Sequence, residues 1–282
     1  MSTISVVIPI YFKEKTETIL NCFRSMSNQT VLPDEIVLVL DNPSTEEIEN
    51  TIDRFASETS IKIIKCYCDR GSGFGALAKV GVEHCSSDYS ARMDIDDVAV
   101  FTRLEKERDF LDKNLNVDVV GSNIAEFENN INEIIAYRIV PSDDKCCKKM
   151  LKRRDPINHM TAMYRRESVL KAGNYSLEMK CFEDSHLWVS FYVHNMVFAN
   201  LQEVLVYVHA GKEMYERRGG KKNYLYIKRI IQFKRKARLI NWLESSFQKM
   251  VYYLVLVLMT KRMRAFVYER VLRHKRIKRC SQ

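Results

Sequence analysis

Short apolar strands alternate with amphipathic helices through the first 121 of the 282 residues, and this alternation restricts the fold more than any other sequence feature. The run Ile4 to Ile10 is rich in β-branched residues, and Thr16 to Met26 places Ile19, Leu20 and Phe23 on one helical face. The pattern predicts further strands at 35–40, 61–66, 89–93 and 117–121, and helices at 45–56, 74–83 and 102–111. Such alternation is typical of β-α-β units, so we expect an α/β fold with a mostly parallel, nucleotide-binding sheet.

The regular alternation of predicted strands and helices ends after Ser122. A polar stretch at 128–133 predicts a turn between antiparallel strands, and Pro141-Ser142-Asp143-Asp144 has the residue types of a helix cap. The remaining pattern predicts a helix at 184–194, one or two strands at 197–209 and successive basic helices at 223–276. The second half is therefore expected to mix α-helices with β-strands.

The positive charge of the chain is concentrated in its C-terminal part. Residues 212–282 hold 21 basic and 4 acidic side chains, a net charge of +17, whereas residues 1–211 have a net charge of −8. This asymmetry predicts an anionic partner for the tail, either a membrane surface or nucleic acid. The uncharged apolar stretch Val251 to Met259 favours the membrane, so no nucleic acid is expected.

Two stretches of the tail set basic residues beside apolar ones at helical spacing. Lys228 to Arg238 does so next to Ile230, Ile231 and Phe233, and Lys261 to Arg279 repeats the arrangement. The apolar residues of the second stretch are Phe266, Val267 and Leu272. This is the pattern of a helix that lies on an anionic membrane leaflet, and the alternative is that the apolar residues pack on the body of the protein.

The sequence predicts neither export nor a membrane-spanning helix. The N-terminus enters the first strand without the basic and apolar regions of a signal peptide, and Val251 to Met259 is about half of the ~20 residues that cross a bilayer. The eight cysteines include no Cys-x-x-Cys pair, as suits a reducing compartment. We therefore expect a cytoplasmic protein that is peripheral on the inner face of the cell membrane.

Acidic and aromatic residues follow three of the predicted strands. Tyr11 follows the first, Asp41 the second, and Asp94-Ile95-Asp96-Asp97 the strand that ends near Met93. Because ligands of a parallel sheet bind at the carboxyl ends of its strands, these residues predict one crevice. Three carboxylates within four residues repel one another unless a cation lies among them, which favours a divalent metal or a diphosphate site. The alternative is that they cap the helix near Thr102.

Two further segments contain residues that could take part in binding or catalysis. One of them, between a strand and a helix, is Arg70-Gly71-Ser72-Gly73-Phe74-Gly75. Its backbone N–H groups and Arg70 could contact the phosphates of a donor. The alternative is that the glycines only make a flexible loop. Glu183 and Asp184 begin a helix, where a carboxylate stays ionised and can act as a general base, or where it only caps the helix. His159 and His186 have no metal-ligand spacing, so both are expected to be structural.

The motifs together resemble the inverting family 2 glycosyltransferases, most of all the bacterial amylovoran-type, O-antigen and capsule enzymes. The segments that carry the resemblance are Val6-Val7-Ile8-Pro9-Ile10-Tyr11, Pro33 to Asn42, Ala91 to Asp97, Arg103-Leu104-Glu105-Lys106, Val119-Val120-Gly121-Ser122, Glu183-Asp184 and Tyr215 to Gly220. The resemblance implies a GT-A fold in residues 1–211, with a nucleotide-binding half at 1–122 and an acceptor-binding half at 123–211. Residues 212–282 would form a basic helical extension.

The resemblance also implies roles for individual residues. Pro9 and Tyr11 would line the pocket of the base, and Asp41 would accept a hydrogen bond from uracil. Asp94 would face the ribose or phosphates, while Asp96 would contact the donor and, with Asp97, bind Mn²⁺ or Mg²⁺. The donor would be a UDP-sugar.

The acid pair is expected to serve the acceptor. Asp184, paired with Glu183, would deprotonate the acceptor hydroxyl, which inverts the anomeric carbon as it attacks. By similarity the transferred sugar is glucose or galactose, and the acceptor is a lipid-diphosphate-linked saccharide. Two segments depart from the family pattern: Asn42 stands where a second acid is common, and Val98 to Phe101 where a proline is common. A sugar nucleotidyltransferase is the alternative enzyme.

Overall fold

The computed structural model describes residues 1–210, 220–260 and 263–264. Its strands are β1 (Ile4–Ile10), β2 (Glu35–Asn42), β3 (Lys62–Asp69), β4 (Tyr89–Arg92), β5 (Val98–Ala99), β6 (Val119–Phe127), β7 (Ile134–Arg138), β8 (Met163–Arg165) and β9 (Phe198–His209). Its helices are α1 (Thr16–Ser27), α2 (Glu46–Glu58), α3 (Phe74–His84), α4 (Arg103–Lys113), α5 (Asp144–Leu151), α6 (Arg166–Lys171), α7 (Glu183–Val193), α9 (Lys221–Lys236) and α10 (Trp242–Tyr253). A 3₁₀ turn, η1 (His159–Thr161), and a π-helical turn, η2 (Leu254–Leu258), complete these elements.

The predicted alternation of strands and helices is confirmed from β1 to α4. The strand expected at 117–121 is longer than predicted, because β6 continues to Phe127 before the polar turn, and β7 then returns antiparallel to it. The expected cap before α5 is also confirmed, since the side chain of Asp143 accepts from the backbone N–H of Cys146. The sequence did not predict β5, β8 and α6, which are two to six residues long.

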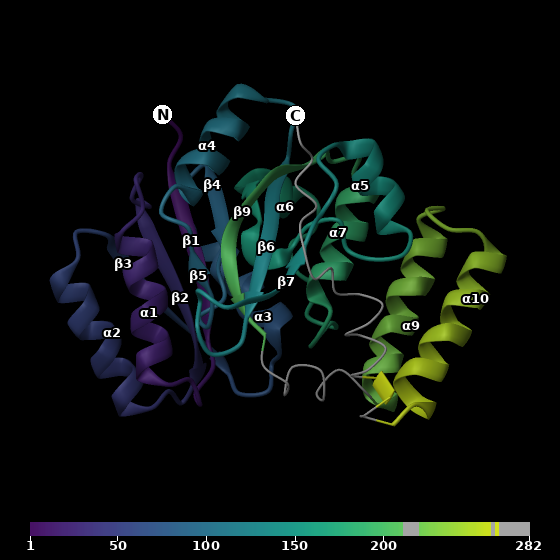
Figure 1. The fold of residues 1–282 in the computed structure, drawn as a ribbon, viewed down its shortest axis with the longest axis horizontal. Helices are drawn as coiled ribbons and strands as arrows, with labels where there is room; N and C mark the ends of the chain where they lie inside the picture. The colour runs from purple at the N-terminus through teal and green to yellow at the C-terminus, as the bar shows by residue number, and fades with distance from the viewer. Residues whose placement is uncertain (211–219, 261–262, 265–282) are drawn as a thin grey trace.

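One nine-stranded sheet runs through the body of the protein in the order β3-β2-β1-β4-β8-β6-β9-β5, with β7 paired to β6 (Figure 1). Strands β1 to β4 are parallel, and β9 is parallel to β6. Strand β8 is antiparallel to both β4 and β6 and joins the two parallel groups. The expected boundary at 122/123 falls inside β6, so the residues on its two sides contribute to one sheet.

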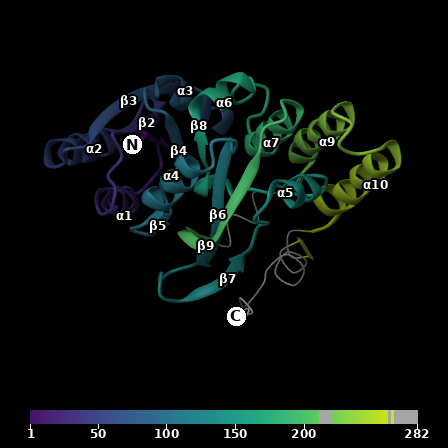
Figure 2. The same cartoon turned by 90° about the horizontal axis from the view of Figure 1, so that it is seen from above.

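Helices cover both faces of the sheet (Figure 2). Ile4, Ile8 and Ile10 of β1 pack with the buried residues of α1, α2 and α4. Val7, on the opposite face of the same strand, packs with Leu77 of α3. Because side chains alternate along a strand, the unbroken apolar run of β1 fills both of these layers.

Helices α9 and α10 form a pair at the edge of the body, with α9 between α10 and α7 in both views (Figures 1 and 2). Ile230 and Ile231 of α9 are buried in the same apolar cluster as Leu187 and Trp188 of α7. The prediction that they contact a membrane is therefore wrong, and the alternative of packing on the body is correct for α9. The apolar residues expected beyond residue 264 lie outside the described residues. Within the described ranges, no helix has the length and apolar character that a bilayer crossing needs.

A fully buried ion pair lies within α4, and its arginine also bonds to the end of β4. Arg103 Nε lies 3.1 Å from Glu107 Oε1, and neither side chain is exposed to solvent. Arg103 Nη2 also donates to the backbone oxygen of Arg92 over 2.7 Å. Burial raises the pKa of Glu107 to about 7, and the charge of Arg103 opposes this rise. The pair holds the chain at the point where the acidic segment Asp94 to Asp97 begins.

We predict that Arg103→Met destabilises the protein by about 3–5 kcal/mol, because Glu107 then remains buried without its counter-charge. Urea unfolding at pH 7 measures this change. The matched control is Arg54→Met, which breaks an i,i+4 pair with Glu58 of similar length (3.0 Å) on the exposed surface of α2. The control should cost less than about 1 kcal/mol. Equal losses in the two variants would contradict the structural role of the buried pair.

Candidate active site

The carboxyl ends of β1, β2 and β3 bring polar and aromatic groups together. The backbone N–H of Phe12, just beyond β1, donates to Asp41 Oδ2 with an N···O distance of 3.4 Å. The guanidinium of Arg70, just beyond β3, lies 3.8 Å from the centroid of the Phe12 ring and donates to the backbone oxygen of Pro43. The structure thus places Asp41 and Arg70, both predicted to contact a nucleotide donor, at one edge of the sheet.

Two aromatic rings lie at the end of β1. Tyr11 is 43% exposed, and its ring centroid is 4.6 Å from that of Phe12. Pro9 is buried inside β1, so it is not among the exposed groups of this edge. Sequence reasoning missed Phe12, although its position directly after Tyr11 at a strand end was a usable signal.

The acidic segment after β4 is held by two separate interactions. Asp94 Oδ1 pairs with Nη2 of the buried Arg92 at 2.5 Å. Asp97 is 2% exposed, and its Oδ1 accepts from the backbone N–H of His209, at the end of β9, over 3.0 Å. The other oxygen of Asp97, Oδ2, is buried and has no hydrogen-bond partner among the described residues. The alternative that these acids cap α4 is wrong, because β5 intervenes and Thr102 is the N-cap residue.

The third acid of this segment faces a histidine. Asp96 Oδ2 lies 4.0 Å from His209 Nδ1, and both side chains are almost half exposed. Burial and then the charge of Asp94 raise the pKa of Asp96, and burial and the neighbouring carboxylates raise the pKa of Asp97 further. Sequence reasoning missed His209, because no local spacing relates it to a segment more than 100 residues earlier.

The acid pair begins α7, as predicted. Glu183 is buried, and its Oε1 lies 4.0 Å from Nδ1 of His159. Asp184 is partly exposed, and its Oδ1 accepts from the N–H of Ser185 over 2.8 Å. Burial and then the charge of Asp184 raise the pKa of Glu183 to about 8, so Glu183 is mostly protonated at neutral pH.

Electrostatic coupling connects the acid pair to the segment after β4. The charges of Arg92 and Asp94 act on the pKa of Glu183 and on that of His159. Burial, and then Arg92, lowers the pKa of His159 to about 3, so its ring stays neutral. His159 Nε2 is 2.7 Å from the Tyr175 hydroxyl. His159 is thus buried, neutral and hydrogen-bonded, as expected of a structural histidine, and it also lies next to Glu183 of the acid pair.

The glycine-rich loop before α3 packs against the segment that leads into α7. A Cβ atom on Gly75 would lie 2.6 Å from the backbone oxygen of Met179. The N–H of Phe74 donates to the backbone oxygen of Lys180, and Lys180 Nζ donates to that of Gly71 over 2.7 Å. The loop therefore helps to place the acid pair. The sequence predicted phosphate contact or a flexible loop here, and neither prediction included this packing.

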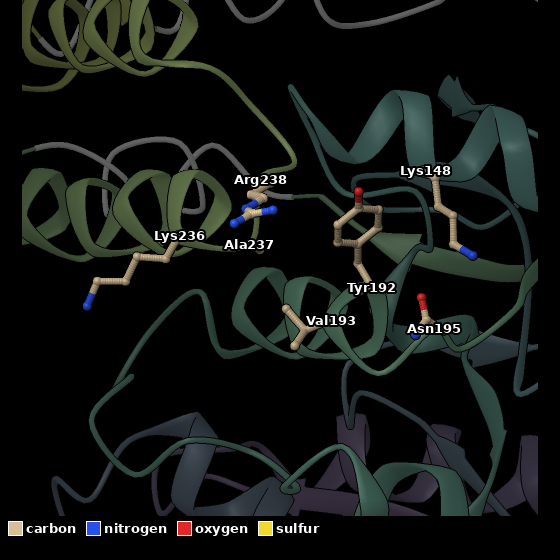
Figure 3. A pocket seen from close by; sticks show the side chains of 7 residues that line it. All are labelled: Lys148, Tyr192, Val193, Asn195, Lys236, Ala237 and Arg238. Carbon is tan, nitrogen blue, oxygen red and sulfur yellow. The ribbon is translucent and has the colours of Figure 1, made fainter.

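A cavity of about 480 Å³ lies elsewhere in the protein (Figure 3). Tyr192 and Val193, at the end of α7, line it together with Lys148 and the segment Lys236 to Arg238. The acid pair begins α7 and this cavity borders its end, so about 15 Å of helix separates them. The cavity is distinct from the candidate active site.

The described residues include no group of three or more His, Cys, Asp and Glu side chains arranged to hold a metal ion. They do provide Asp96 with His209, and the unsatisfied oxygen of Asp97 beside them. Oxygen and imidazole donors suit Mn²⁺, and Mg²⁺ commonly combines one or two carboxylates with substrate phosphates. The residues present fit a metal whose coordination a diphosphate completes.

Two relatives match almost the whole chain. The amylovoran biosynthesis glycosyltransferase AmsE of Erwinia amylovora is 30% identical over an alignment of 270 residues that covers 94% of this chain and 98% of AmsE. The UDP-Gal:alpha-D-GlcNAc-diphosphoundecaprenol beta-1,3-galactosyltransferase of Escherichia coli is also 30% identical over 270 residues, 95% of this chain and 96% of that enzyme.

Solved structures confirm the expected GT-A fold. TarS residues 1–349 of S. aureus, in complex with UDP-GlcNAc, superpose with a TM-score of 0.65 at 16% identity over 96% of this chain and 76% of that one. This chain covers 44% of a longer TarS structure. The mannosyltransferase PcManGT of Pyrobaculum calidifontis, with GDP-Man and Mn²⁺, gives a TM-score of 0.61 at 14% identity over 90% of this chain and 70% of that one.

The family model described as glycosyl transferase family 2 matches residues 5–173. This match covers β1 to α6, including the acidic segment after β4. The resemblance seen in the sequence is thereby confirmed: the chain belongs to glycosyl transferase family 2, and it is a glycosyltransferase.

Proposed function

We propose that the enzyme transfers glucose or galactose from a UDP-sugar, with inversion, to a lipid-diphosphate-linked saccharide in bacterial O-antigen or capsule synthesis. One observation supports the proposal: Asp41 and Arg70 both contact Phe12 at the ends of β1 to β3, and the charges of Arg92 and Asp94 at the end of β4 act on Glu183 of the acid pair. The names of AmsE and of the Escherichia coli galactosyltransferase support the pathway and the acceptor class.

The donor nucleotide would lie across the ends of β1, β2 and β3. Tyr11 and Phe12 offer ring surface for the uracil base, and the buried carboxylate of Asp41 is an acceptor for its N–H group. Pro9 would support this pocket from within β1. Arg70 is an exposed cation on the same edge and would face the negative charge of the diphosphate.

Asp96 and Asp97, with His209, would hold Mn²⁺ or Mg²⁺ beside the diphosphate. When bound, such an ion acts as a Lewis acid that stabilises the negative charge of the departing UDP. Arg92 neutralises Asp94 from beneath, so the segment presents fewer uncompensated charges to the incoming anion. Mn²⁺ bound with GDP-Man to PcManGT supports the choice of a divalent cation.

Asp184 would act as the general base. It is the more accessible member of the pair, and a base must reach the acceptor hydroxyl directly. Its carboxylate takes the hydroxyl proton as the acceptor oxygen bonds to the anomeric carbon, and the bond from that carbon to the diphosphate oxygen breaks. A single displacement of this kind inverts the anomeric configuration. Glu183, protonated and buried, would keep the negative charge on Asp184.

A lipid-linked acceptor also gives the protein a location. We expect the enzyme to be peripheral on the cytoplasmic face of the cell membrane, because the lipid chain holds the acceptor in that membrane and the enzyme must reach the acceptor there. The net charge of +17 in residues 212–282 is suited to anionic headgroups.

We predict that UDP-galactose or UDP-glucose supports transfer to a synthetic GlcNAc- or GalNAc-diphosphate-lipid, and that the product carries a β-linkage. A screen of UDP-sugars with both acceptors measures the activity, and NMR of the product gives the linkage. GDP-mannose is the matched control donor. Transfer from none of the UDP-sugars, or a product that retains the anomeric configuration, would contradict the proposal.

We predict that Asp184→Asn lowers kcat by about 10²–10⁴-fold, because the acceptor hydroxyl loses its base. UDP affinity, measured by isothermal titration calorimetry, should stay nearly unchanged, since Asp184 is not expected to contact the donor. The control is Glu183→Gln, which should be milder because Glu183 is already protonated near neutral pH. If Glu183→Gln is the more damaging change, the two roles are reversed, and an equal loss of UDP binding would assign Asp184 a structural role.

A further inference from the structure

The outer face of α10 and η2 is apolar and exposed. Leu243, Phe247, Met250, Leu254 and Leu258 follow one another at intervals of three or four residues, which places them on one side of the helix. Their exposed fractions range from 43% to 68%. We call these five residues the apolar outer face. Trp242 and Tyr253, also exposed, flank it near the two ends of α10.

The packing of α10 turns this face away from the body. Ser245 is buried, Tyr252 packs on the apolar cluster that contains Trp188 of α7, and Gln248 donates to the backbone oxygen of Lys152. Helix α10 lies at the outer edge of the molecule in both views, with α9 on its inner side (Figures 1 and 2). The apolar outer face is therefore a free surface of the described chain, and it differs from the face of α9 that packs on α7.

The surroundings of the apolar outer face are basic. Residues 220–260 and 263–264 hold ten basic side chains and one acidic side chain. Gly220 N–H donates to Leu256 O over 2.8 Å, which brings Lys221 and Lys222 to the η2 end. Arg264 donates to the same oxygen over 3.1 Å. Three cations thus gather where the apolar outer face ends.

This combination favours an anionic lipid surface over a second copy of the chain. Two copies that paired through α10 would bring their basic surroundings together, and like charges repel. A helix with an apolar face, flanking aromatic residues and basic neighbours is typical of segments that lie in the headgroup region of a bilayer. The helix would lie on the membrane surface, since no described helix is suited to crossing it.

The η2 end is close to the acid pair. Cys181, two residues before Glu183, has its Sγ 4.0 Å from Asn223 Oδ1 at the start of α9. The same turn of α9 contacts η2 through the hydrogen bond of Gly220 to Leu256. The first turn of α9 therefore links the η2 end of the apolar outer face to the start of α7, where the acceptor hydroxyl would arrive.

We propose that the apolar outer face of α10 and η2 docks on an anionic bilayer, with the exposed Lys221 and Lys222 against the headgroups, and that it presents the acid pair to the lipid-linked acceptor. The second part of this inference rests on the proposed function, whereas the docking itself does not.

The test is the binding of the full chain to vesicles that contain no acceptor. We compare phosphatidylcholine vesicles with vesicles of 70% phosphatidylcholine and 30% phosphatidylglycerol by flotation. The variant Phe247→Gln with Leu254→Gln should lose at least about tenfold in partition onto the anionic vesicles, because two apolar side chains leave the contact. The matched control is Phe101→Gln with Leu115→Gln, since Phe101 and Phe247 are both 62% exposed and Leu115 is also exposed. The control should bind like the unmodified chain.

Activity and oligomeric state complete the test. The α10 variant should keep its activity on a short soluble acceptor and lose activity on a long-chain acceptor in vesicles. Unchanged vesicle binding by the α10 variant would overturn the proposal, as would sedimentation that shows an α10-dependent dimer with no vesicle binding. If no UDP-sugar is transferred but binding still depends on α10, the docking stands and the proposed function fails.

Discussion

The hydrogen bond from the backbone N–H of His209 to Asp97 Oδ1 joins residues 112 positions apart and sets the shape of the candidate active site. It forms because β5 pairs antiparallel with β9 and sets Val98, the residue after Asp97, opposite Tyr207. Strand β9 also pairs parallel to β6 as far as Phe127 opposite His209, with two register shifts between Ser122 and Ile124. The carboxyl end of β9 thereby reaches the edge where β4 ends. Asp97 would otherwise be a buried carboxylate without this donor, a costly arrangement. The contact also brings the imidazole of His209 to the exposed carboxylate of Asp96.

Buried arginines counterbalance the acids of this edge. Arg103 holds the backbone oxygen of Arg92, and Arg92 pairs with Asp94. The pKa of Glu183, raised by burial and by the charge of Asp184, removes a further negative charge near neutral pH. The proposed function requires little net repulsion toward a diphosphate donor and an ionised carboxylate as the base for the acceptor. The fold supplies them from β4, α4 and α7.

Local sequence patterns predicted most of the fold, the acidic segment and the acid pair, but not β8 or His209. The strand and helix alternation, the acidic segment after β4 and the acid pair are all local, so their spacing was readable. Strand β8 has three residues, too few to show a periodicity, and it is this strand that joins the two parallel groups. His209 depended on the register of β9 and left no local signal. The periodicity of Ile230 and Ile231 was read correctly as amphipathic, but a periodicity does not say whether protein or lipid covers the apolar side.

The most direct test of this account is Mn²⁺ binding to the enzyme with and without UDP, followed by the electron paramagnetic resonance signal of the free ion. If Asp96, Asp97 and His209 hold a metal that a diphosphate completes, UDP should tighten Mn²⁺ binding by about tenfold or more, and Asp96→Asn should abolish that gain. Asp109→Asn, the same chemical change on the surface of α4, should preserve it. Mn²⁺ binding that UDP does not affect, or that Asp96→Asn leaves intact, would contradict the account.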